Sequence, residues 1–73
     1  MNPDRLERAH DRMVDALGSD SAAHSMVECL ARRGVAARVA MGPARCGREG
    51  HTSTCVDVVT PQGVVTLRGD CCA

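Results

Sequence analysis

The chain has 73 residues, no Phe, Trp or Tyr, and nine basic residues against nine acidic ones. A chain of this length forms one small domain with a thin core, so a metal, a cross-link or a protein partner, including a second copy of the chain, would stabilise it. The lack of aromatic rings excludes nucleic-acid binding by base stacking. The zero net charge excludes overall electrostatic attraction to nucleic acid or to a membrane surface.

No stretch of the sequence approaches the roughly 18 apolar residues that span a bilayer. The N-terminus has the pattern of a charged helix rather than that of a signal peptide. We therefore expect a cytoplasmic protein with no membrane partner. In that compartment its five cysteines are expected to be reduced, metal-bound or redox-active rather than permanently bridged.

Residues 1–34 predict a helical hairpin. The first helix has a start signal in Asn2-Pro3-Asp4 and a stop at Gly18, and Ser19-Asp20-Ser21 can cap the second helix. The apolar positions recur at helical spacing and are Leu6, His10, Met13 and Leu17 in the first helix and Ala23, Met26, Val27 and Leu30 in the second. Cys29 is expected to be a small core residue, and His10 a semi-buried one.

Residues 35–73 predict a β-meander. Strands are expected at residues 36–41, 52–60 and 64–71, because these segments are rich in β-branched and apolar residues, and a polar loop separates the first two. The segment Pro61-Gln62-Gly63 is typical of the turn of a hairpin. The whole chain is therefore predicted to have an α+β fold of order ααβββ, with both helices on one face of a three-stranded antiparallel sheet.

The last 28 residues contain a cysteine and histidine cluster. Its candidate metal ligands are Cys46, His51, Cys55, Cys71 and Cys72. A three-residue turn would place Cys71 on the face of Cys55, whereas a two-residue turn would place Cys72 there. Three thiolates with one imidazole, or four thiolates, suit Zn²⁺, so a zinc or other soft-metal site that stabilises the thin core is the expected cofactor site.

The same thiols permit other interpretations. Cys55 can form a disulfide with Cys71 or Cys72, a thiol can be redox-active, or the cysteines can have no common site. The terminal Cys71-Cys72-Ala73 is similar to the Cys-Cys-Ala ending of mercuric reductases, which implies collection of a soft metal ion by the terminal pair.

The stretch from Cys29 to Arg48 contains five arginines and no acidic residue. These candidate anion or nucleic-acid contacts are Arg32, Arg33, Arg38, Arg45 and Arg48. A nucleic-acid-binding regulator is therefore an alternative, although the usual role of such a stretch is a solvated surface.

A second alternative comes from a resemblance. The succession of a helix, Arg33-Gly34, a strand, Gly50-His51 and a hairpin resembles HicA-type RNA-cleaving toxins, in which His51 would be the catalytic histidine. This resemblance and that of the tail are short, so we assign the chain to no family. We predict a small cytoplasmic binding or regulatory module that is not an enzyme and holds Zn²⁺ through its thiol cluster.

Overall fold

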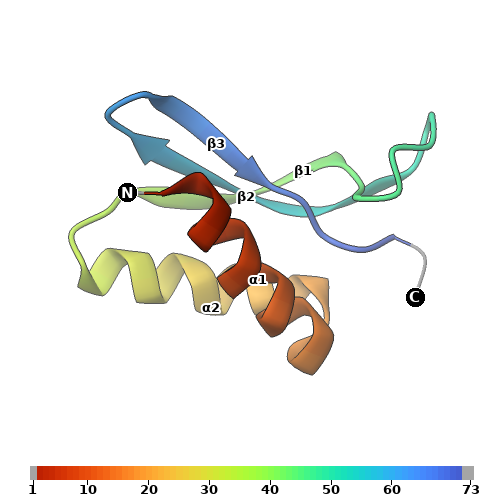
Figure 1. Cartoon of the computed structure of the whole chain (residues 1–73). Helices are drawn as coiled ribbons and strands as arrows, with labels where there is room; N and C mark the ends of the chain where they lie inside the picture. Colours follow the sequence, from red (N-terminus) through yellow and green to blue (C-terminus); the bar gives the residue numbers. More distant parts are fainter. Residues whose placement is uncertain (1, 72–73) are drawn as a thin grey trace.

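Two helices and three strands follow one another along the chain. The computed structural model describes residues 2–71 and contains α1 (Pro3–Leu17), α2 (Ser19–Arg32), β1 (Ala37–Pro43), β2 (Thr52–Thr60) and β3 (Gly63–Leu67). The strands form one antiparallel sheet in the order β1-β2-β3, and both helices lie on the same face of it (Figure 1). The predicted ααβββ fold is therefore confirmed. Within the described residues, neither helix has the length and apolar character needed to cross a membrane.

The two helices meet at Gly18. At the start of α1 the Asn2 side chain accepts a hydrogen bond from the Asp4 backbone N–H (2.9 Å), as the sequence predicts. Gly18, at φ +87°, ends α1 and also stands at the N-cap of α2, where no side chain caps the helix. The prediction that the segment beginning at Ser19 caps α2 is therefore wrong, and the Ser19 hydroxyl is used elsewhere.

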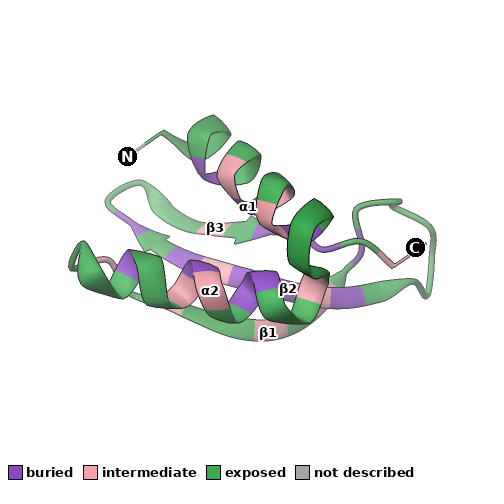
Figure 2. Cartoon of the chain, turned by 90° about the horizontal axis from the view of Figure 1, so that it is seen from below, coloured by how far each residue is buried: buried purple, intermediate pink, exposed green. Residues whose placement is uncertain are grey.

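The hydrophobic core lies between the helices and the sheet. It contains no side chain larger than Leu or Met, and its buried residues are Leu6, Ala23, Met26, Leu30, Val56, Val58 and Leu67. Figure 2 shows buried residues along β2 and at intervals along both helices. Burial of a large aliphatic side chain of this kind stabilises the fold by about 1.5–3 kcal/mol. With only seven members, one of them Ala and two of them Val, the core is as thin as the composition indicates.

Two further expectations about the helices are wrong. Leu17 is 54% exposed, whereas Val14, four residues after His10, lies on the buried side of α1. Cys29 is exposed rather than buried. It lies beside a hollow between α1 and α2, lined by Leu6 and Met13 among others, that neither helix fills.

The hairpin between β2 and β3 has a two-residue turn. Thr60 pairs with Gly63, so the three-residue register, which would have placed Cys71 on the face of Cys55, is wrong. The strand β3 ends at Leu67, four residues earlier than predicted, whereas β1 extends two residues further than predicted. Beyond Leu67 the tail forms hydrogen bonds with the β1–β2 loop and with α2, and this departure from the sheet creates the candidate site.

Candidate metal centre

The loop between β1 and β2, residues 44–51, carries two predicted ligands, Cys46 and His51. Its ends are joined by a hydrogen bond from the Ala44 backbone N–H to the His51 carbonyl (3.1 Å), and Ala44 is buried. Gly47 turns the loop at φ +71°, a conformation that glycine adopts without strain. The closed loop therefore returns the chain so that its two ligand side chains come together.

The tail, residues 68–71, lies against this loop. The Gly69 carbonyl accepts a hydrogen bond from the Arg45 backbone N–H (2.9 Å). The Arg45 guanidinium lies 2.6 Å from the Asp11 carboxylate on α1 and 3.9 Å from that of Asp70. One arginine thus connects the first helix, the loop and the tail, and it stands next to the first cysteine of the cluster in the sequence.

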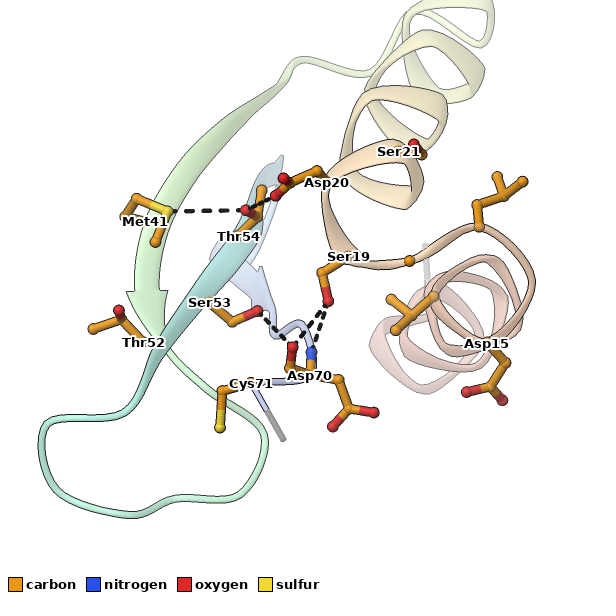
Figure 3. A pocket seen from close by; sticks show the side chains of 13 residues that line it. Asp15, Ser19, Asp20, Ser21, Met41, Thr52, Ser53, Thr54, Asp70 and Cys71 are labelled. Carbon is orange, nitrogen blue, oxygen red and sulfur yellow. Dashed lines mark hydrogen bonds between the residues drawn. The ribbon is translucent and has the colours of Figure 1, made fainter. Parts of the chain in front are cut away.

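Two serine hydroxyls also hold the tail. The Asp70 backbone N–H donates to Ser19 Oγ (2.9 Å), and the Asp70 carbonyl accepts from Ser19 Oγ (3.2 Å) and Ser53 Oγ (3.3 Å). Figure 3 shows both serine side chains directed at the backbone of Asp70, with Cys71 beside it in the tail. Hydrogen bonds from α2 and β2 therefore fix the position of Asp70, the residue before the thiol.

The loop and the tail bring three candidate ligands together. The Sγ atoms of Cys46 and Cys71 are 2.9 Å apart, and His51 Nδ1 lies 3.5 Å from the first and 3.4 Å from the second. Cys46 and His51 are exposed, and Cys71 is half-buried. These three residues, called the cysteine–histidine cluster below, can hold a metal ion, because one ligand atom of each lies within 4.8 Å of the other two.

The spacing of the cluster can be compared with a zinc shell. Tetrahedral Zn²⁺ with bonds of about 2.3 Å to sulfur and about 2.0 Å to nitrogen separates sulfur from nitrogen by about 3.5 Å and sulfur from sulfur by about 3.8 Å. The two distances from His51 Nδ1 already match the first value. The two sulfurs would move apart by about 0.9 Å to receive the ion.

Of the other two predicted ligands, Cys55 does not belong to the cluster and Cys72 lies outside the described residues. Cys55 is buried, and its Sγ makes contacts of 3.6 Å and 3.5 Å with the carbonyls of Pro43 and Ser53. A Cβ on Gly42 would lie 3.2 Å from the same sulfur, so the end of β1 covers this thiol. The proposed pairing of Cys55 with the end of the tail is not seen for Cys71, and Cys72 lies outside the described residues.

The predicted anion contacts are distributed over the molecule. Arg32 and Arg33 end α2 and Arg38 lies on β1, whereas Arg45 and Arg48 lie in the loop, at the opposite end of the molecule from the C-terminus of α2 (Figure 1). Two of them face carboxylates: Arg45 as described, and Arg38, whose Nε lies 3.6 Å from Asp57. Nucleic-acid binding stays a prediction, as does the catalytic role that the HicA-type resemblance gives His51.

Sequence reasoning missed the residues that position the cluster. Ser19, Ser53 and Gly69 carry no motif, and Ser19 is 51 residues from its partner Asp70. Only the register of the strands and the docking of α2 bring these groups together.

The role of Arg45 can be tested by stability. Arg45→Met removes both ion pairs but keeps the aliphatic stem, and we expect it to lower the free energy of unfolding by about 1 kcal/mol, the upper end for partly exposed pairs. Arg48→Met in the same exposed loop is the matched control, with an expected change below about 0.5 kcal/mol. Urea unfolding of the two variants measures both values. Equal effects would show that the ion pairs of Arg45 do not hold the tail.

Comparison with known proteins gives no match to a family model, to a curated protein or to a solved structure. The function is therefore inferred from the residues of the chain itself.

Proposed function

We propose that this protein is a small, non-enzymatic metal-binding module in which Cys46, His51 and Cys71 hold a structural Zn²⁺. The observation that carries the proposal is the convergence of two thiols and an imidazole nitrogen within 4.8 Å. Thiolates and imidazole together form a soft shell that Zn²⁺ occupies in many small domains. A bound ion would fasten the tail to the loop.

Because the hydrophobic core is thin, a bound metal ion would add to the stability of the fold. Neither the loop nor the tail contributes a residue to the seven-member core cluster, and hydrogen bonds and one partly exposed arginine join the two segments to each other and to the rest of the molecule. Metal binding to the folded state adds RT ln(1 + [L]/Kd), about 2.7 kcal/mol at a metal concentration of 100 times Kd. In a domain of this size such a gain raises Tm by about 10–20 °C.

Native mass spectrometry of protein purified without chelator tests the proposal first. We expect one Zn²⁺ per chain, and a fall in Tm of at least about 10 °C when the metal is removed by a chelator. Co²⁺ added to the metal-free protein should give thiolate-to-cobalt charge-transfer absorption and the visible bands of tetrahedral coordination. Protein that binds neither ion, with the same Tm in chelator and in added Zn²⁺, would contradict the proposal.

Variants identify the ligands. Cys46→Ser, His51→Ala and Cys71→Ser are each expected to weaken Zn²⁺ binding at least about 10-fold, because loss of a residue that merely hydrogen-bonds to a metal ligand already costs about 10–100-fold. Cys29→Ser is the matched control, because Cys29 is exposed and belongs to no candidate ligand group among the described residues. Loss of zinc binding in that control would contradict the assignment.

Two further variants separate this cluster from the ligand set expected from the sequence. Cys55→Ala should keep the zinc stoichiometry, because that thiol is buried against the end of β1. Cys72→Ser tests whether the neighbouring thiol supplies a fourth ligand. A decrease in Zn²⁺ affinity of about 10-fold or more, which corresponds to about 1.4 kcal/mol, would show that Cys72 is a ligand.

A further inference from the structure

The two sulfurs of the cluster are close enough to react with each other. Cys46 and Cys71 come from segments 25 residues apart, yet their Sγ atoms are separated by 2.9 Å. A disulfide bond is about 2.05 Å long, so bond formation requires a closing movement of about 0.9 Å. The sulfur separation therefore lies midway between that of a disulfide and the roughly 3.8 Å of a zinc-bound pair.

We propose that Cys46 and Cys71 form a redox-active dithiol that hydroperoxides oxidise to an intramolecular disulfide, and that this oxidation abolishes the metal site. Only the second part of this inference, the loss of the metal site, rests on the proposed function, because formation of the disulfide needs no metal.

Accessibility favours Cys46 as the first thiol to react. Its side chain is exposed, whereas Cys71 is half-buried and Cys55 is buried. A small hydroperoxide can therefore reach the sulfur of Cys46, and the sulfur of Cys71 lies 2.9 Å from it. Cys29 is also exposed, but it lies on α2 and belongs to no group of candidate ligands among the described residues.

The reaction balances with hydrogen peroxide as the only oxidant. Cys46 Sγ attacks one peroxide oxygen, the O–O bond breaks, and the thiol becomes a sulfenic acid while the second oxygen leaves as water with the thiol proton. Cys71 Sγ then attacks the sulfenic sulfur, the S–S bond forms, and the sulfenic oxygen leaves as a second water with the proton of Cys71. Two thiols are oxidised by two electrons, and one peroxide is reduced to two waters.

The disulfide and the metal shell exclude each other. A metal-bound pair needs both sulfurs as thiolates about 3.8 Å apart, and the disulfide consumes both of them at about 2.05 Å. Oxidation leaves His51 as the one remaining ligand of the cluster. Peroxide therefore releases the metal, and a dithiol reductant restores the site.

The experiment treats the full chain with hydrogen peroxide in both metal-free and zinc-loaded forms. Expected results are a mass loss of two hydrogen atoms, a peptide map with Cys46 linked to Cys71, and release of Zn²⁺ to a chromogenic chelator in step with disulfide formation. Dithiothreitol should reverse all three. Cys29→Ser should behave as the parent chain, and Cys46→Ser should form no intramolecular link.

The outcomes separate the two proposals. Disulfide formation in a chain that never binds zinc would support the redox pair and overturn the metal site. Zinc binding without a Cys46–Cys71 link under peroxide would support the metal site and overturn the redox inference. A link from either thiol to Cys72 would overturn the assignment of the pair, and Cys72→Ser checks this because it should leave the expected link intact.

Discussion

Replacing Gly69 with alanine is expected to dislodge the tail and weaken metal binding. A Cβ at this buried position would lie 2.5 Å from both Ser53 Oγ and the Thr54 carbonyl, and 2.8 Å from Ser19 Oγ. Side-chain rotation can relieve the serine contacts, but the carbonyl belongs to the β2 backbone, so the tail itself must shift. Overpacking of this kind costs about 1–3 kcal/mol.

The shift should appear in metal affinity as well as in stability. Cys71 follows Gly69 by two residues, and the hydrogen bonds of the intervening Asp70 set its position. If the free energy of Zn²⁺ binding becomes less favourable by about 1.4 kcal/mol, the affinity for Zn²⁺ decreases about 10-fold. Competition with a chromogenic chelator measures the affinity, and urea unfolding of the metal-free protein measures the stability.

Gly34→Ala is the matched control for this prediction. Gly34 has φ +75°, and a Cβ added there would have no neighbouring atom within 4 Å, so alanine costs about 1 kcal/mol of backbone strain without any steric contact. It precedes β1 and is remote in sequence from every cluster residue. Both variants should be less stable, but only Gly69→Ala should lose metal affinity. An unchanged affinity in Gly69→Ala would show that the tail does not position the thiol.

Replacing His10 with leucine is expected to stabilise the protein and reduce its sensitivity to acid. The His10 imidazole is only 1% exposed, and neither ring nitrogen has a hydrogen-bond partner among the described residues. A buried polar group without a partner costs about 1–3 kcal/mol, and leucine of similar volume avoids that cost. We therefore expect His10→Leu to raise the free energy of unfolding by about 1 kcal/mol near neutral pH.

The pH dependence follows from the same burial. Burial lowers the pKa of His10 from its usual 6.5; the neighbouring Asp11 acts in the opposite direction, and Arg45 lowers it further. His10, Asp11 and Arg45 line a second hollow, and the other charged residues that line it are Glu7 and Arg68. The unfolded chain therefore binds a proton at a higher pH than the folded chain does. The contribution of neutral His10 to the free energy of unfolding is fully present above pH 6.5 and decreases as the pH falls below 6.5 towards the lowered pKa.

Urea unfolding in chelator, from about pH 7.5 to about pH 5.5, measures this effect without a contribution from bound metal. The parent chain should lose stability over that interval, and His10→Leu should lose less. His24→Leu is the matched control, because His24 is exposed on α2 and its Nδ1 lies 2.8 Å from the Asp20 carbonyl. The same acid sensitivity in His10→Leu and in the parent chain would contradict the prediction.

The local elements could be predicted because their signals are local. Asn2 and Pro3 mark the start of α1 and Gly18 marks its end, and each acts within one helical turn. The β-branched run at residues 52–60 coincides with β2. The concentration of thiols and a histidine in the second half also indicated a metal site before the fold was known. Three of the five predicted ligands, Cys46, His51 and Cys71, converge in the structure.

Two cysteines, Cys29 and Cys55, show where local reasoning ends. Cys29 has the spacing of a core residue on α2, but it is exposed because α1 covers only part of that side of the helix. Cys55 is enclosed by Gly42 and Pro43 at the end of β1, and Cys72, the thiol that a two-residue turn would bring to the face of Cys55, lies outside the described residues. Burial of a particular side chain depends on which element lies over it, and helical or strand periodicity does not contain that information.

The sequence by itself determined the order and type of the elements, the thinness of the core and the presence of candidate metal ligands in the second half of the chain, since each depends on residue types and short-range spacing. Only the tertiary structure decided the two-residue turn, the end of β3 at Leu67 and the selection of Cys71 for the cluster. A one-residue change in register moves every side chain to the other face of a strand. The tail leaves the sheet after Leu67 and forms hydrogen bonds with Arg45 of the loop and Ser19 of α2, residues that are distant in the sequence and that only the packing of the loop and α2 brings near it.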